Sequence, residues 1–240
     1  MSGPPQIRQS LFGPYRPRRI SPSRLEAFSD AVFGFSATLL VVSLEVPRTF
    51  PELLQSLEGF VAFGLSFLAL ILIWTTHNSF FRRYAPTDRM TMALNALLLF
   101  VVLFFVYPLK YISISFADAV LGIGDGAASV ETESQLQTLF VVYGAGFVAV
   151  FLCFAMLYLN VERRLAGVLE LTPLERYDAR TATQFHLILA GMGLASVALA
   201  GHGIGIRFGV LSGWMYAFLG PICAAHGYWR GSRRERVARA

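Results

Sequence analysis

Five polar side chains interrupt long apolar stretches of this sequence, and their chemistry is hydrogen bonding or proton transfer. They fall in three separate segments, 24–47, 57–79 and 90–109, and are Ser29, Asp30, Trp74, His77 and Asn95. A charged group at the centre of a membrane helix costs about 2.5–3.5 kcal/mol on insertion scales, so such groups usually point inward and find partners. The pattern therefore predicts a polar cluster that joins three helices.

The sequence contains no convincing catalytic constellation. Its four histidines, at positions 77, 186, 202 and 226, are scattered and lack the HExxH or i, i+4 spacing of a metal site. The glycine-rich run "LGIGDGA" lacks the Lys-Ser/Thr of a phosphate-binding loop and the strand and helix of a dinucleotide fold. We therefore expect a protein that is not an enzyme and that needs no cofactor or resident metal.

The composition requires a bilayer as solvent. The chain has 240 residues, of which 55% are hydrophobic and only 15% charged, and its mean hydropathy is +0.56. About 20 apolar residues span a hydrocarbon layer of about 30 Å, and six windows meet this length. The sequence thus predicts an all-α membrane protein with six transmembrane helices, at 25–46, 57–79, 90–109, 138–160, 183–203 and 206–228.

The basic residues predict the orientation of these helices. Arginines gather before the first window and after the second, fourth and sixth, whereas the other loops carry mostly Glu and Asp. Because Lys and Arg in short loops stay on the cytoplasmic side, both termini are expected in the cytosol. The expected organisation is a disordered basic arm at 1–23, a transmembrane domain at 24–229 and a basic tail at 230–240. The arms would face anionic lipid, and no nucleic-acid partner is expected.

Two local signals predict where elements end. Pro108 is expected to end the third helix, because proline lacks a backbone N–H and clashes with the preceding turn. The alternating charges of segment 161–182 favour a solvated helical connector between the fourth and fifth spans.

A helical wheel separates the first helix into two faces. With Phe35 at 0° and about 100° per residue, a stripe forms within about 60° of Phe35. It consists of Ala31, Thr38, Leu39 and Val42, continued toward the helix start by Arg24 and Phe28. Ser29 and Asp30 lie off this stripe and would face neighbouring helices.

Under this topology Trp74, His77 and Asn95 share the membrane depth of Asp30. We expect these groups, with Ser29, to form a polar clamp that fixes the tilt and rotation of the first helix. The alternative is a direct role of Asp30 or His77 in proton sensing or transport.

The sequence resembles the transmembrane protein 175 family of endosomal and lysosomal potassium channels and their prokaryotic relatives. The resemblance rests on "RLEAFSDAVFGFSATLLVV" (24–42), "WTTHN" (74–78) and "LNALLL" (94–99), and is specific over the first three helices. It implies a prokaryotic homotetramer of six-helix subunits in the cell inner membrane, with four copies of helix 1 around a central pore for monovalent cations.

The resemblance also implies roles for single residues. The apolar constrictions fall on Phe35, Leu39 and Val42, and a pore-side hydroxyl, beside which K⁺ would pass transiently, falls on Thr38. Family members commonly read "AIAITLL" where this chain reads "GFSATLL", so an aromatic ring replaces an isoleucine at the innermost constriction. The clamp residues implied are Arg24, Phe28, Ser29, Asp30, Trp74, His77 and Asn95.

The function implied is a potassium-permeable channel in which hydrophobic constrictions act as gate and modest filter. No backbone-carbonyl filter loop like "TVGYG" is present, and an apolar ring gates by dewetting. The alternatives are a proton-coupled secondary transporter or proton-permeable channel that uses Asp30 and His77, and a passive scaffold without transport. Repeated halves and broken helices typical of many transporters are not found.

Overall fold

The computed structural model describes residues 18, 21–42, 48–118, 122, 132–202, 215–216 and 218–239. The elements within these ranges are helical, and they are α1 (Arg24–Val42), α2 (Phe50–Tyr84), α3 (Arg89–Phe116), α4 (Glu133–Asn160), a π-helical turn η2 (Val161–Leu165), α5 (Pro173–Gly201) and α8 (Leu219–Arg239). The predicted all-α class is therefore confirmed for the described residues.

Five of the described helices are long and apolar enough to cross a membrane: α1, α2, α3, α4 continued through η2, and α5. The sixth predicted window, 206–228, includes 206–214 and 217, which lie outside the described residues. Its described remainder belongs mainly to α8, which continues as helix through the basic segment 230–239.

The helix starts follow from short polar residues in the sequence. Thr49 and Asp88 each accept one free backbone N–H group in the first turn of α2 and α3, and Thr132 and Thr172 form capping boxes at α4 and α5. Ser23 and Glu26 exchange the same pair of bonds at α1: the Ser23 N–H donates to Glu26 Oε2 over 2.7 Å, and the Glu26 N–H donates to Ser23 Oγ over 3.2 Å. These caps fix where each helix enters the bundle.

Two expectations are wrong. α3 passes through Pro108 and ends at Phe116; proline cannot donate the backbone hydrogen bond of a helix interior, but membrane helices tolerate this loss where neighbouring groups satisfy the freed carbonyl. The helical connector expected at 161–182 is packed rather than solvated in its second half, because α5 begins at Pro173 and Asp178, Ala179 and Thr181 are buried. Capping by Thr172 and packing against neighbouring helices outweigh the local charge pattern there.

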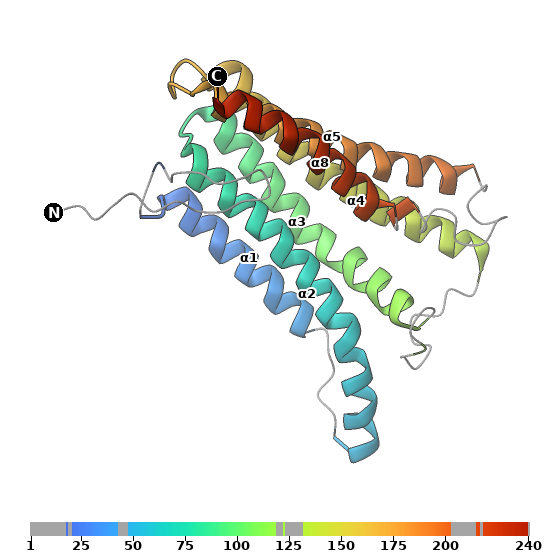
Figure 1. Cartoon of the computed structure of the whole chain (residues 1–240). Coiled ribbons are helices and arrows are strands. Elements are labelled where there is room, and N and C mark those ends of the chain that lie inside the picture. Colours follow the sequence, from blue (N-terminus) through green and yellow to red (C-terminus); the bar gives the residue numbers. More distant parts are fainter. Residues whose placement is uncertain are drawn as a thin grey trace.

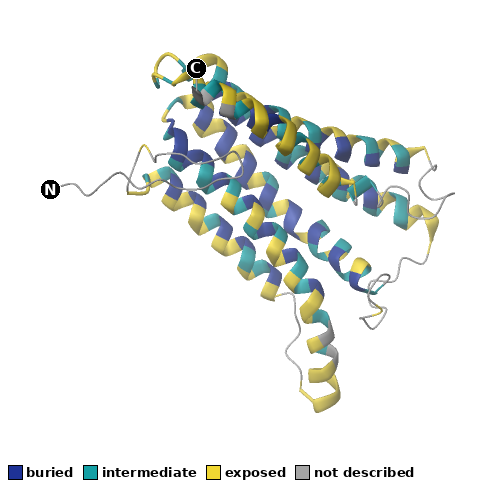
Figure 2. Cartoon of the chain, in the orientation of Figure 1, coloured by how far each residue is buried: buried dark blue, intermediate teal, exposed yellow. Residues whose placement is uncertain are grey.

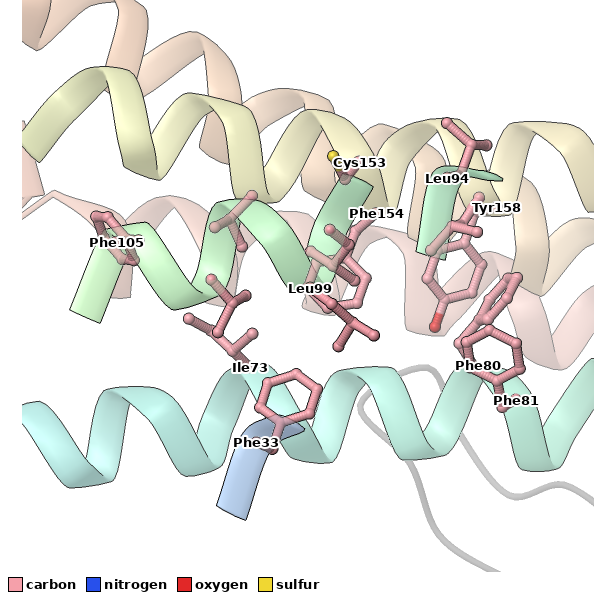
Figure 3. Close-up of a cluster of buried hydrophobic side chains, with 14 of the residues drawn as sticks. Phe33, Ile73, Phe80, Phe81, Leu94, Leu99, Phe105, Cys153, Phe154 and Tyr158 are labelled. Atoms are coloured by element: carbon pink, nitrogen blue, oxygen red, sulfur yellow. The ribbon is translucent and has the colours of Figure 1, made fainter. Parts of the chain in front are cut away.

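The helices pack in two groups that meet at α3 and α4. In Figure 1, α1 and α2 lie on one side of α3, while α4, α5 and α8 lie on the other. The side chains between the groups are mainly aromatic and branched aliphatic, as Figure 3 shows for Phe33, Phe80, Leu99, Phe154 and Tyr158. Figure 1 also shows the start of α2 projecting beyond α1.

The apolar residues are not confined to this core. Figure 2 shows exposed positions along the outer faces of several helices, and large hydrophobic side chains on α1, α2 and α3 are more than 40% exposed, among them Val42, Leu72, Phe100 and Phe104. Apolar surface of this extent in contact with water would be costly. It is the surface expected where lipid or another subunit provides the surroundings.

Candidate functional site

One face of α1 is anchored in the bundle. Its buried residues recur at three- and four-residue spacing and are Glu26, Ser29, Phe33, Ser36 and Leu40. This spacing places them on one side of a helix. The buried side of α1 faces α2 and α3, with which α1 is in contact.

The opposite face of α1 is open. Phe35 is 58% exposed and Val42 is 72% exposed, while Thr38 is also exposed. Leu39 differs, because it is half-buried and packs against the core. The chain therefore presents most of the predicted stripe outward, away from its own helical bundle.

Thr38 brings a polar group to this apolar face. Its hydroxyl donates to the Gly34 carbonyl one turn earlier over 3.0 Å, which is the usual way a threonine satisfies its proton in a helix. The bond orients the side chain and uses the hydroxyl proton, so that the oxygen can still act as an acceptor. No other hydroxyl lies on the exposed stripe between Phe28 and Val42.

Three of the predicted polar residues meet in the core between α1, α2 and α3. His77 Nε2 lies 2.7 Å from Asn95 Oδ1, and Asn95 Nδ2 donates to Ser29 Oγ over 3.0 Å. All three side chains are buried. The His77 ring also contacts the rings of Phe33 and Phe81, with centroids 5.4 Å and 4.6 Å away. The chain of bonds crosses from α2 through α3 to α1.

Asp30 makes a separate link. The Trp74 indole Nε1 donates to Asp30 Oδ1 over 2.8 Å, although the Asp30 residue itself is classed as exposed. Arg24 and Phe28, which complete the predicted cluster, are both exposed, and Phe28 is 61% exposed. The structure thus brings together Ser29, His77 and Asn95 as one set and Asp30 and Trp74 as another, and leaves Arg24 and Phe28 at the surface.

A second polar network was not anticipated from the sequence. Asp178 on α5, only 1% exposed, pairs with Arg83 at the end of α2 and with Arg234 on α8. Arg234 Nε lies 2.9 Å from Asp178 Oδ1, and Arg234 Nη2 lies 3.0 Å from Asp178 Oδ2. One signal was available: Asp178 shares a helix face with the buried residues Ala182 and Leu189.

The same end of the bundle holds a third network, between α3 and α4. Asn160 donates to Asp88 Oδ2 and to Thr91 Oγ1, each over 3.1 Å, and the Thr91 N–H donates to Asp88 Oδ2 over 3.1 Å. Burial alone would raise the pKa of Asp88, but the bonds from Thr91 and Asn160 outweigh it and hold that pKa below its ordinary value. The carboxylate is therefore ionised at neutral pH.

Part of the N-terminal segment also reaches this end. The Arg18 N–H donates to the Arg82 carbonyl over 3.1 Å, and its guanidinium donates to the Leu169 carbonyl over 2.7 Å and lies 3.3 Å from Glu175. Most of the predicted basic arm, 1–17, 19 and 20, lies outside the described residues.

The long apolar helices define the class first: this is a helical integral membrane protein. A family model described as the endosomal/lysosomal potassium channel TMEM175 matches residues 24–105. A protein of Marivirga tractuosa named "Potassium channel" is 32% identical over 226 residues, which cover 90% of each chain. The chain therefore belongs to the TMEM175 family, as its resemblance predicted.

Solved structures agree with this assignment. The crystal structure of the potassium channel MtTMEM175, a threonine-to-alanine variant bound to a Nanobody-MBP fusion protein, matches with a TM-score of 0.79 and 30% identity, over 91% of this chain and 97% of that one. A lysosomal potassium-selective channel homologue from Chamaesiphon minutus matches with a TM-score of 0.55 and 24% identity, over 88% and 96%. The second match supports the fold alone. Relatives named as channels are not enzymes, in agreement with the sequence.

Proposed function

We propose that this protein is a potassium-permeable channel whose pore is lined by α1 from four identical subunits. The observation that carries the proposal is the two-sided character of α1: one face is packed into the subunit, and the other exposes Phe35, Thr38 and Val42. Relatives that cover most of the chain are named potassium channels. A face that must meet three symmetry-related copies has to be left open within one subunit.

The proposed gate consists of Phe35, Leu39 and Val42, which lie one above the other at i, i+4 and i+7. Four copies of each would form apolar rings that exclude water when narrow and admit a cation only when they widen. Potassium sheds water more easily than sodium, so a narrow apolar neck with a ring of Thr38 hydroxyls would favour potassium modestly. No dedicated cage of oxygen ligands is required for this mechanism.

The two polar links hold α1 in the orientation that this pore needs. Trp74 holds Asp30 on one side of the helix, and Asn95 holds Ser29 on another. A helix tied at two points on its circumference cannot rotate freely, so the apolar stripe keeps its direction. We assign these links a structural role. We also place both termini, and the end of the bundle where the arginines gather, in the cytosol of a prokaryotic cell.

A flux assay on the purified protein in liposomes tests the proposal. Potassium efflux above that of empty liposomes, with smaller fluxes for sodium, is the expected result; caesium provides a second comparison. Absence of any cation flux would support the passive scaffold instead. Strict dependence of potassium movement on an opposing proton gradient, lost in Asp30→Asn, would support the proton-coupled transporter.

A further inference from the structure

We propose that the outer face of α8 binds the headgroup of an anionic phospholipid. This surface consists of Ile222, Trp229, Arg233 and Arg236, and the inference goes beyond the channel function. On a helical wheel with Trp229 at 0°, the other three fall at about 20°, 40° and −20°. All four residues are exposed, so they form one continuous stripe.

The opposite side of α8 is fixed to α5, which makes the stripe a rigid surface. Arg230 Nη2 donates to Thr181 Oγ1 over 2.8 Å, and its guanidinium lies 4.3 Å from the centre of the Tyr177 ring. One turn later Arg234 pairs with the buried Asp178. Arg230 and Arg234 are thus engaged by protein, whereas Arg233 and Arg236 point away from these contacts.

Contacts with α5 place the stripe at the edge of the hydrocarbon layer. α5 has no charged residue from 181 to 201, and α8 has none from its start at 219 to 229. The His226 ring lies 6.0 Å from the Phe185 ring, and Arg230 reaches Thr181. The uncharged segments of both helices therefore end at the same depth, close to Trp229.

The order of side chains along the stripe matches the order of groups in a phospholipid. Ile222 lies within the apolar segment, Trp229 lies at its edge, and Arg233 and Arg236 lie beyond it. Trp is characteristic of the bilayer interface, where its ring is apolar and its N–H is polar. The Arg233 guanidinium lies 3.9 Å from the centre of the Trp229 ring, which holds it near the depth of a phosphate.

Charge identifies the occupant as anionic. Two exposed guanidiniums on one stripe attract a phosphate, and each guanidinium can bind two phosphate oxygens at once. Each basic residue near an anionic surface contributes about 1 kcal/mol. A zwitterionic headgroup carries a compensating positive charge and would gain less from the same pair.

Native mass spectrometry of the purified full chain tests the proposal, with phosphatidylglycerol and phosphatidylcholine as probes. The wild type should retain phosphatidylglycerol in preference to phosphatidylcholine. R233Q/R236Q should weaken phosphatidylglycerol binding about tenfold or more, whereas R233K/R236K, which keeps both charges, should retain most of it.

R163Q/R164Q is the matched control, because it removes two exposed arginines from η2 at the same end of the bundle. It should bind phosphatidylglycerol like the wild type. Unchanged binding in R233Q/R236Q, or an equal loss in R163Q/R164Q, would overturn the proposal. The melting temperature in phosphatidylcholine should be the same in all variants, which excludes misfolding as the cause.

Discussion

Thr38 places a hydroxyl on a face of α1 that is otherwise apolar. Its proton is already used by the Gly34 carbonyl, so the oxygen would turn lone pairs toward a passing ion. If α1 lines the pore, this is the point where a partly dehydrated cation finds a ligand. A change at Thr38 should therefore alter ion preference separately from conduction itself.

Replacing Thr38 with alanine should lower the preference for potassium over sodium. A polar contact of about 0.5–1.5 kcal/mol corresponds to roughly a two- to tenfold change in permeability ratio. Reversal potentials under potassium and sodium gradients measure it. Thr38→Ser, which keeps the hydroxyl, should preserve the ratio, and an unchanged ratio in the alanine variant would remove Thr38 from the filter.

At the scale of elements, α1 is held by hydrogen bonds as well as by apolar packing. Asn95 is the central member of its set, because it bonds both to His77 and to Ser29. Its loss would leave the buried His77 ring without the partner of its Nε2 atom. Hydrogen bonds between membrane helices are modest individually, but an unsatisfied buried group costs more than the bond gains.

Asn95→Ala should therefore lower the free energy of unfolding by about 1–3 kcal/mol. Thermal unfolding in detergent measures the change. Thr75→Ala on α2 is the control, since it removes only a bond from an exposed threonine to its own helix. If both variants melt at the same temperature, the links to α1 do not stabilise the bundle.

The start of α3 should respond to acid. The folded-state pKa of Asp88 is lowered, so its stabilising effect is present above the ordinary pKa of about 3.9 and is lost as pH falls through the folded value. The stability difference between the wild type and Asp88→Asn should shrink below about pH 4. Melting temperatures at pH 7, 5 and 3.5 measure this; a difference that grows toward low pH would contradict it.

The sequence predicted some of these elements better than others, for physical reasons. The period of 3.6 residues placed Phe35, Thr38 and Val42 on one face, because α1 is a regular helix. A hydropathy window could not find the start of α2, since Thr49 caps it several residues before the apolar run begins. The ends of helices depend on caps, whereas windows detect only their apolar middles.

Long-range polar pairing was the other feature that the sequence did not reveal. Arg83, Asp178 and Arg234 are separated by 95 and 56 positions. Charge patterns within one segment suggested solvent exposure there. Only the antiparallel packing of α5 and α8 beside the end of α2 buries this carboxylate between two arginines.

At the scale of the whole molecule, Asp178 links three helices from distant parts of the chain. Asp178→Asn would remove the carboxylate charge that pairs with Arg83 and Arg234, and breaking a buried pair in this way typically costs about 3–5 kcal/mol. Glu162→Gln is the control, because its pair with the exposed Arg180 spans 3.8 Å and should contribute about 0–1 kcal/mol. Chemical unfolding should separate the two variants; equal stabilities would show that Asp178 is not a structural link.

The proposed pore requires several copies of this chain to assemble. Apolar exposure on α1 is compatible with lipid as well as with a pore, so exposure alone does not distinguish them. Contact with water distinguishes the two surroundings, because a side chain that lines a pore meets aqueous solution and a side chain that faces lipid does not. Val41 and Val42 offer a matched pair, since both are exposed and they differ by about 100° around α1.

The most direct test is the accessibility of cysteines at these two positions to a water-soluble, charged thiol reagent during potassium current recordings. If α1 lines the pore through the face of Phe35, Thr38 and Val42, the reagent should block the current through Val42→Cys channels but not the current through Val41→Cys channels. Block at Val41→Cys with none at Val42→Cys would mean that α1 turns a different face to the ions, and would contradict this pore lining.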